Sequence, residues 1–352
     1  PQVAARGGAG EAELWPADTD RPMLTFRGHT GTVSDIKFLP SGDRLVTAGA
    51  DGKVFEVQVF PQGDRVVSIG ADGVAIVWNV TSGEALQRLE QRAPAGEDVY
   101  HRVRVFPDGG RVVTAVQVRD SRVGSMAVVW DVATGRALRS LTQRLGPIRF
   151  LEVSPDAATV VTVARRTASM WDAASGEVSD QHMDHAGLIT GVAFAEGGAK
   201  VVTCSIDGTV VIFDILTGAR KHVWMGEPII GVAPVPGGDR IVTYTSRTVV
   251  MWNVATGDPL GMFLGAGDIE RVAVSADASF IAACSSHMPE HRQGTTVWEL
   301  ATGRRLQVLR EEDEEGSPAW RPCSVALGSG RPPHVGWSAE HSHGGPRPAV
   351  RV

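Results

Sequence analysis

Residues 192–218 have the sequence VAFAEGGAKVVTCSIDGTVVIFDILTG, in which glycine-containing turns separate three apolar, β-branched runs. The runs 192–194, 200–204 and 209–215 predict strands, because β-branched residues favour extended backbone. Asp207-Gly208 lies between the second and third runs and is a strong hairpin signal, since glycine accepts the positive φ of a tight turn. A fourth run, 221–224, completes a predicted four-stranded antiparallel sheet. One such sheet cannot bury both of its faces, so further copies must pack against it.

The turn after the third strand recurs six times along the chain, at intervals of 39 to 52 residues. Its glycines are Gly83, Gly135, Gly176, Gly218, Gly257 and Gly303. An aromatic residue stands five positions before each glycine: Trp78, Trp130, Trp171, Phe213, Trp252 and Trp298. A repeat of about 40 to 45 residues with four strands is typical of one blade of a β-propeller.

The chain resembles the WD40-repeat β-propellers over residues 11–309, through Gly28-His29, Trp130-Asp131, Trp171-Asp172 and the Asp-Gly turns. The resemblance implies an all-β fold, a propeller of four-stranded antiparallel blades. We expect seven blades, with one truncated repeat at residues 28–54. There Val54 runs directly into the next repeat, about twenty residues short of a full period. A splice variant, a gene-model error and a genuine degenerate blade would each produce this junction.

The predicted organisation has three parts. Residues 1–10 are rich in glycine and alanine and are expected to be disordered. Residues 11–327 form the predicted propeller, with six full repeats over 55–309 and partial repeats at 11–26, 28–54 and 318–327. Residues 11–26 resemble the third and fourth strands of a blade, and they either help to close the ring or belong to a propeller further upstream. Residues 328–352 are rich in proline, glycine and histidine and are expected to form an irregular tail.

Composition argues against several classes of partner. The net charge is −6 and no run of lysine or arginine is present, which disfavours nucleic acid as a partner. No apolar stretch approaches the roughly 20 residues of a membrane span. Three cysteines, Cys204, Cys284 and Cys323, are too few for a disulfide framework, and the first two are expected to be free core residues. These features predict a cytoplasmic protein; they leave its oligomeric state open.

The resemblance also implies a hydrogen-bond network within each blade. It joins a histidine before the first strand, a hydroxyl on the second strand, the turn aspartate and the tryptophan of the third strand, because a buried indole N–H and a buried carboxylate both need partners. The chain matches this network in part, at His29, Asp51, Asp72, Trp78, Trp130, Trp171, His185, Asp207, Phe213, Trp252 and Trp298. Phe213 lacks the indole donor. We expect all of these residues to be structural.

No catalytic, cofactor-binding or metal-binding residue is predicted. His287-Met288-Pro289-Glu290-His291 matches an H-x-x-E-H pattern, but that chemistry needs both histidines on one helix, and here the segment contains a proline and falls in a hairpin turn. The tail histidines lack the spacing of a zinc site. An enzyme built on a propeller is therefore the least favoured hypothesis.

The favoured hypothesis is a non-catalytic scaffold that binds other proteins. Two repeats carry insertions in the turn between the second and third strands, at 117–125 and 286–294. Insertions on one face of a repeat protein often mark its binding side. The candidate partner-binding residues are Arg119, Arg122, His287, Glu290 and Arg292. The alternative is a sensor module of a larger switch protein, because the repeats also resemble the WD regions of NACHT- and WD-repeat-containing proteins.

Overall fold

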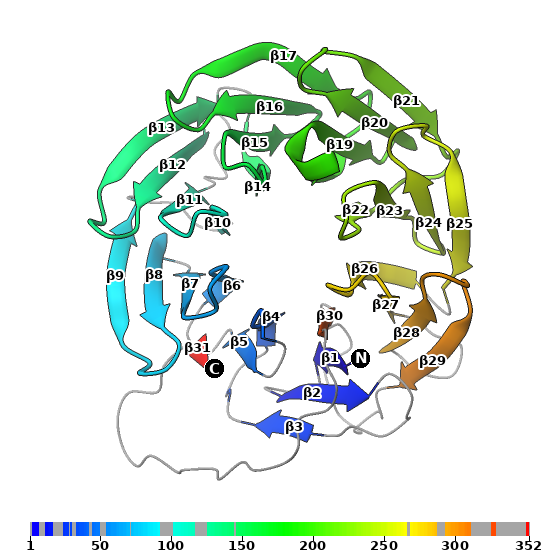
Figure 1. Cartoon of the computed structure of the whole chain (residues 1–352), viewed down its shortest axis with the longest axis horizontal. Helices are drawn as coiled ribbons and strands as arrows, with labels where there is room; N and C mark the ends of the chain where they lie inside the picture. The colour runs from blue at the N-terminus through cyan, green and yellow to red at the C-terminus, as the bar shows by residue number, and fades with distance from the viewer. Residues whose placement is uncertain are drawn as a thin grey trace.

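The computed structural model describes residues 2–6, 11–16, 24–27, 29, 33–41, 44–49, 54–70, 72–91, 101–116, 125–143, 146–265, 268–286, 293–310, 325–328 and 350–351. Their strands form eight separate sheets, which stand as blades around a common axis (Figure 1). Within these ranges the structure has no α-helix, and the single helical element is a short 3₁₀ turn, η2 (Glu196–Gly198). The chain is an all-β propeller of antiparallel blades.

Six of the blades contain four strands each in chain order, from the innermost to the outermost (Figure 1). Their strands are β6 (Val54–Val59), β7 (Arg65–Gly70), β8 (Val74–Asn79), β9 (Ala85–Glu90); β10 (His101–Val105), β11 (Arg111–Val116), β12 (Ser125–Asp131), β13 (Ala137–Gln143); β14 (Ile148–Val153), β15 (Thr159–Ala164), β16 (Thr167–Asp172), β17 (Val178–Asp184); β18 (Ile189–Ala195), β19 (Lys200–Ser205), β20 (Thr209–Asp214), β21 (Arg220–Trp224); β22 (Gly231–Pro234), β23 (Arg240–Tyr244), β24 (Thr248–Asn253), β25 (Pro259–Leu264); β26 (Asp268–Val274), β27 (Phe280–Ser286), β28 (Gln293–Glu299) and β29 (Arg305–Arg310). They occupy the stretch in which six full repeats were expected.

The two ends of the chain build one blade together. Its strand order is β3 (Leu24–Arg27), β2 (Glu11–Pro16), β1 (Gln2–Arg6), β30 (Val325–Gly328), with β30 innermost. β30 pairs with β1 from Gln2↔Gly328 to Ala5↔Val325. Residues 11–26 thus supply the third and fourth strands of the blade that closes the ring. The expectation of disorder over residues 1–10 was wrong for residues 2–6, because β30 offers β1 an edge to pair with.

Among the described residues, the blade next to this closure is incomplete, with three strands in place of four. β4 (Val33–Phe38) and β5 (Leu45–Gly49) form its first two strands, and β31 (Val350–Arg351) pairs with β5 at Thr47 and Ala48. The described residues therefore form eight sheets, and the expected seven blades are not confirmed, since β4 and β5 form a sheet of their own. The last residues of the expected irregular tail include the paired strand β31.

The hydrophobic core is divided into layers between neighbouring blades. One layer joins Phe60, Ile69 and Val77 of the β6–β9 blade to Val103 and Trp130 of the next blade, all at most 7% exposed. The same arrangement recurs at the following interfaces, where Trp171, Phe213, Trp252 and Trp298 each pack on the blade before their own. Burying each large apolar side chain stabilises the fold by about 1.5–3 kcal/mol. Each of these five core layers is shared between two neighbouring blades, so the blades that they join stabilise one another.

Cys284 on β27 is disulfide-bonded, which corrects the expectation of a free thiol. Cys204 on β19 is free and fully buried, and burial raises the pKa of its thiol to about 12. The prediction of a cytoplasmic location rested partly on unpaired cysteines and loses that support. In the described part of the chain, no helix has the length and apolar character needed to cross a membrane.

Candidate interaction site

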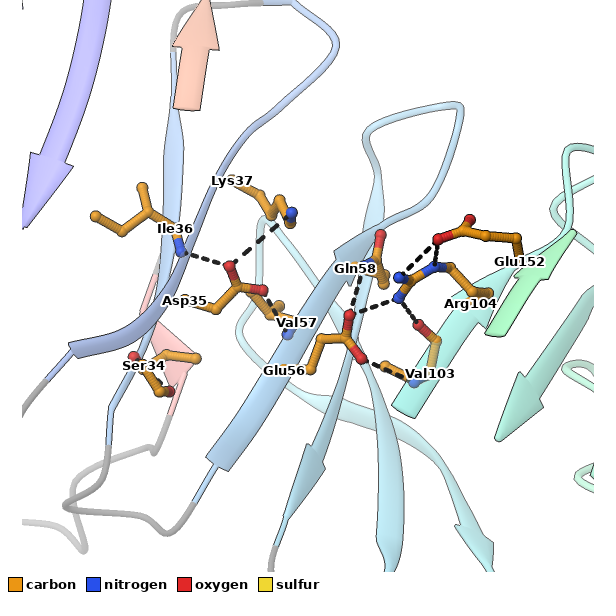
Figure 2. Close-up of polar contacts among 11 residues, drawn as sticks. Ser34, Asp35, Ile36, Lys37, Glu56, Val57, Gln58, Val103, Arg104 and Glu152 are labelled. Carbon is orange, nitrogen blue, oxygen red and sulfur yellow. Dashed lines mark hydrogen bonds and ion pairs between the residues drawn. The ribbon is translucent and has the colours of Figure 1, made fainter. Parts of the chain in front are cut away.

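Charged side chains join three neighbouring inner strands at the centre of the ring (Figure 2). Glu56 on β6 accepts a hydrogen bond from the backbone N–H of Val103 on β10, at 3.0 Å. The guanidinium of Arg104, also on β10, donates to Glu56 on one side. On the other side its Nε and Nη2 donate to Glu152 Oε1 on β14, at 3.1 and 3.0 Å. We call Glu56, Arg104 and Glu152 the carboxylate clamp.

Asp35 on β4 repeats the first half of this arrangement one blade earlier. Its Oδ2 accepts from the N–H of Val57 on β6 at 3.2 Å, and its Oδ1 accepts from the N–H of Ile36 at 3.0 Å (Figure 2). Because Asp35 and Glu56 hold successive inner strands, the incomplete blade is fixed to the ring through its first strand.

Both partners at the core of the clamp are charged at neutral pH. Burial alone would raise the pKa of Glu56, but Arg104, Arg102 and the Val103 N–H outweigh it and lower that pKa. Burial lowers the pKa of Arg104, and the carboxylates of Glu152 and Glu56 more than reverse this. Glu56 is only 8% exposed, so its charge depends on these partners. The clamp has the character of a structural ion-pair network rather than a reactive site.

The opposite side of the ring centre is lined by small residues. Ala193 and Ala233 stand where the clamp side carries long polar side chains, and Gly191 and Gly231 lie two positions before them. The Tyr244 side chain occupies the space that a Cβ on Gly231 would take, so a larger residue at 231 would have to displace this tyrosine. At the rim of this half is a cavity of about 500 Å³. It is lined by apolar residues of β18 and β22 and by the turns after them, and Glu152 is its one charged lining residue within the described chain.

Tryptophans of four blades donate their indole N–H to hydroxyls on the second strand. The pairs are Trp78–Ser68 (2.9 Å), Trp130–Thr114, Trp171–Thr162 and Trp252–Thr243 (2.8 Å each). In each case the hydroxyl stands two residues after the cross-strand partner of the tryptophan, and residues i and i+2 share one face of a strand. Trp298 has Ala283 at that position and is held by packing.

Two glutamines occupy the place expected for histidine, and the sequence reasoning missed them. Gln91 and Gln143 accept hydrogen bonds from Thr114 and Thr162 through Oε1, at 2.6 Å each. His29 and His185 contact Thr47 and Thr203 in the same way, at 3.0 and 2.8 Å. The spacing offered a signal, because each histidine stands 18 residues before its threonine and Gln143 stands 19 before Thr162.

The β18–β21 blade has the fullest network although Phe213 replaces tryptophan. His185 Nδ1 lies 2.7 Å from Thr209 Oγ1, and the Thr209 hydroxyl donates to Asp207 Oδ1. Since that hydroxyl donates to the carboxylate, Nδ1 must carry the imidazole proton, and Nε2 accepts from Thr203. Burial tends to raise the pKa of Asp207, but Thr209 and the N–H of Gly187 lower it to about 2.

The remaining candidate residues either make a single hydrogen bond or lie outside the described residues. The Asp72 carboxylate accepts from the N–H of Val74 at 3.0 Å. Asp51 lies outside the described residues. So do all five proposed partner-binding residues, Arg119, Arg122, His287, Glu290 and Arg292, together with the H-x-x-E-H segment. Within the described ranges, no three His, Cys, Asp or Glu side chains gather as a metal site.

A family model described as WD domain, G-beta repeat, matches residues 20–56 and 178–214. The second match ends at Asp214, the last residue of β20, and includes the His185–Thr203–Asp207 network. The chain contains WD40 repeats. The first match covers the incomplete blade of β4 and β5.

The known proteins that this chain resembles have low sequence identity to it. Autophagy-related protein 16 of Arabidopsis thaliana is 25% identical over 199 residues, covering 52% of this chain and 37% of the relative. Cilia- and flagella-associated protein 52 is 23% identical over 214 residues in Sus scrofa and 22% in Homo sapiens, in each case covering 60% of this chain and 29% of the relative. The matched part of the chain thus spans roughly a third of the length of these relatives.

Replacing His185 by glutamine should make this WD40 ring less sensitive to acid. Burial lowers the pKa of His185 in the folded chain, and the nearby Asp207 carboxylate opposes this only in part. The unfolded histidine therefore binds a proton more readily, and stability falls as the pH drops through about 6.5. Gln91 and Gln143 do the same structural work in other blades, so His185→Gln should cost less than about 1 kcal/mol at pH 7.

Melting temperatures of both chains between pH 7.5 and 5, by differential scanning fluorimetry, will check this prediction. The wild type should lose stability faster as the pH falls. Asp207, with its pKa near 2, loses its contribution only below about pH 3.8 and does not affect this window. Parallel curves for the two chains would show that His185 does not titrate with unfolding.

Proposed function

We propose that this WD40 protein is a non-catalytic scaffold that binds other proteins across the mouth of the ring, on the rim that carries its two insertions. In an antiparallel blade the turn between the second and third strands lies at the opposite end from the turn between the first and second. The segments 117–124 and 287–292 connect β11 to β12 and β27 to β28, so both leave from the same rim.

The positions of these two blades support the proposal most directly. Counted around the eight sheets, the β10–β13 and β26–β29 blades are four places apart in either direction (Figure 1). The ends of β11 and β12 therefore face those of β27 and β28 across the centre of the ring. One partner seated over the axis can contact both insertions at once, and two linked contacts bind more tightly than either alone.

The carboxylate clamp supports the scaffold proposal because it holds one of the two insertion-bearing blades rigidly in the ring. Glu56, Arg104 and Glu152 tie the β10–β13 blade to the blades on both of its sides. A binding surface that is already fixed before the partner arrives loses less conformational entropy on binding. This suits a scaffold whose insertions must keep a constant separation.

The test replaces 117–124 and 287–292, singly and together, by the tight turn that joins β19 to β20, Ile206-Asp207-Gly208. The purified wild-type chain and each variant are used as baits in affinity capture, and the intensities of the captured proteins are compared by quantitative mass spectrometry. Each single replacement should weaken the same set of captured proteins, and the double replacement should remove that set, by at least tenfold in intensity.

A matched control changes the other rim and leaves the insertions intact. Asp239→Lys alters an exposed carboxylate beside the turn after β22, on the rim of the apolar cavity, and should leave the captured set unchanged. Capture that survives the double replacement in a folded ring would overturn the proposal. The sensor alternative stays a prediction, since a nucleotide-binding domain would lie outside these residues.

A further inference from the structure

The outer strand β25 lies at the perimeter of the ring (Figure 1), and its sequence, PLGMFL, is apolar. Leu260, Met262 and Leu264 are 48%, 66% and 67% exposed. They alternate with Phe263, which is 3% exposed and packs between this blade and the next. Exposed apolar residues that line up along one strand form a continuous stripe, unlike single surface leucines, which are common.

Backbone N–H and C=O groups of β25 point away from β24 at two of these exposed residues. The N–H of Gly265 donates to Arg247 O at 2.9 Å, and β25 pairs with β24 in the register Val249↔Phe263 and Val250↔Met262. Hydrogen-bonded and non-bonded pairs alternate along an antiparallel ladder, so Val249–Phe263 is a bonded pair and Val250–Met262 is not. The N–H and C=O of Met262, and by the same alternation those of Leu264, therefore point away from β24. Among the described strands none pairs with this edge.

The sequence of β25 differs from that of every other described outer strand. PLGMFL contains no charged residue. The other six each carry at least one: β3, β9, β13, β17, β21 and β29 contain Arg27, Arg88, Arg139, Asp180, Lys221 and Arg305 among others. Charged side chains on an edge strand discourage pairing with another strand. β25 lacks this protection, although its residues face solvent.

We propose that β25 pairs with β25 of a second copy of this chain, antiparallel about a two-fold axis at Met262. In this register Met262 faces Met262 of the partner subunit, and Leu260 faces Leu264 of the partner subunit. These pairings use the outward-pointing backbone groups of Met262 and Leu264 and bring the apolar side chains onto one face, with Cβ atoms about 4.5–5.5 Å apart. A two-fold axis places equivalent segments of the two strands against each other, so charged side chains near the axis would face like charges and repel. β25 has no charged side chain, and this repulsion does not arise.

The contact is small and the dimer is correspondingly weak. Three apolar side chains and one strand ladder per subunit bury less than the 1,200–2,000 Å² of a standard interface. Sedimentation equilibrium of the full chain from about 5 to 500 µM should therefore show the average mass rising with concentration toward twice that of the monomer.

Substitutions at the two-fold axis provide the decisive test. Met262→Lys places two lysines opposite each other, and Met262→Glu places two glutamates, so each variant alone should self-associate at least about tenfold more weakly. An equimolar mixture of the two should associate again, because lysine then faces glutamate. Leu216→Lys is the matched control: Leu216 is 93% exposed in a turn of the neighbouring blade, and its change should leave self-association intact.

Three results would overturn the proposal. The first is a wild-type chain that stays monomeric over the whole concentration range. The second is a Met262→Lys chain that dimerises like the wild type, which would place the interface elsewhere. The third is a mixture of the two charge variants that stays monomeric, which would exclude the Met262 register. Circular dichroism of each variant confirms that the ring has folded.

Discussion

Replacing Arg104 by methionine is expected to lower the free energy of unfolding by about 2–4 kcal/mol at neutral pH. Methionine keeps most of the side-chain volume but removes the ion pairs with both Glu56 and Glu152. Glu56, which is 8% exposed, then keeps a buried charge with the Val103 N–H and the Gln58 amide as hydrogen-bond partners and Arg102 as the one remaining positive charge acting on it. The Arg104 side chain is 21% exposed, which sets the estimate below that for a fully buried pair. Urea unfolding at pH 7 provides the measurement.

The pH dependence of this loss distinguishes a broken ion pair from poor packing. In the wild type the pKa of Glu56 is lowered, so its contribution is present above about pH 4.5 and is lost as the pH falls below it. Arg104 is the largest of the interactions that lower this pKa, so without it we expect burial to raise the pKa of Glu56 above its value in the unfolded chain. The variant should then become relatively more stable as the pH falls. The difference between the two chains should therefore shrink between pH 7 and 5.

Two further variants act as controls. Glu56→Gln combined with Arg104→Met removes both charges and should recover a large part of the lost stability. In a double-mutant cycle this recovery appears as the coupling energy between Glu56 and Arg104. Glu152→Gln should cost less than about 1 kcal/mol, because the Glu152 side chain is 30% exposed and Arg104 keeps Glu56. A difference that stays constant with pH would show that packing, and not charge, accounts for the Arg104→Met loss.

Removing the strand that closes the ring should have a second large effect. A chain ending at residue 324 lacks β30, the innermost strand of its blade, and leaves the inner edge of β1 without its partner. We expect a loss of at least about 3 kcal/mol, or a melting temperature lower by more than about 6 °C, because β30 also lies beside β4, β26 and β27 of the two neighbouring blades. Thermal unfolding followed by circular dichroism provides the measurement.

A chain ending at residue 328 is the matched control. It keeps β30 and loses only β31, which pairs with β5 at two residues, so its stability should lie within about 1 kcal/mol of the full chain. A synthetic peptide of residues 318–328 should restore stability to the chain that ends at 324. If the two shortened chains melt together, β30 does not close the ring.

The sequence was sufficient to predict the repeated part of the fold. Strand alternation and the recurring turn glycines located six blades, because both depend on local physics: side chains alternate in a strand, and positive φ favours glycine. Gly208 has φ of +82°, and a Cβ there would lie 3.1 Å from Glu227 O. The third and fourth strands of the closing blade were also recognisable from residues 11–26.

Long-range pairing explains what the sequence missed. β1 pairs with β30, which lies more than three hundred residues away, and its segment does not alternate clearly enough to be recognised as a strand without that partner. β30 itself falls largely within the partial repeat expected at 318–327. Gln91 and Gln143 were not predicted because the WD40 pattern has histidine at this place. The Thr114 and Thr162 hydroxyls require only a hydrogen-bond acceptor, which glutamine also provides. The carboxylate clamp joins residues 48 apart, on strands whose mutual positions only the closed ring defines.

The carboxylate clamp also restricts how this ring can change over evolutionary time. Repeat proteins commonly gain or lose whole units, because each unit contacts only its neighbours. Here Arg104 pairs with a carboxylate from the blade before it and another from the blade after it. Deleting or exchanging the blade that carries Glu56, or the one that carries Arg104, would leave a buried charge without its main partner. The order of the blades on this side of the ring is therefore fixed by their chemistry, whereas the alanine- and glycine-lined side is freer to diverge.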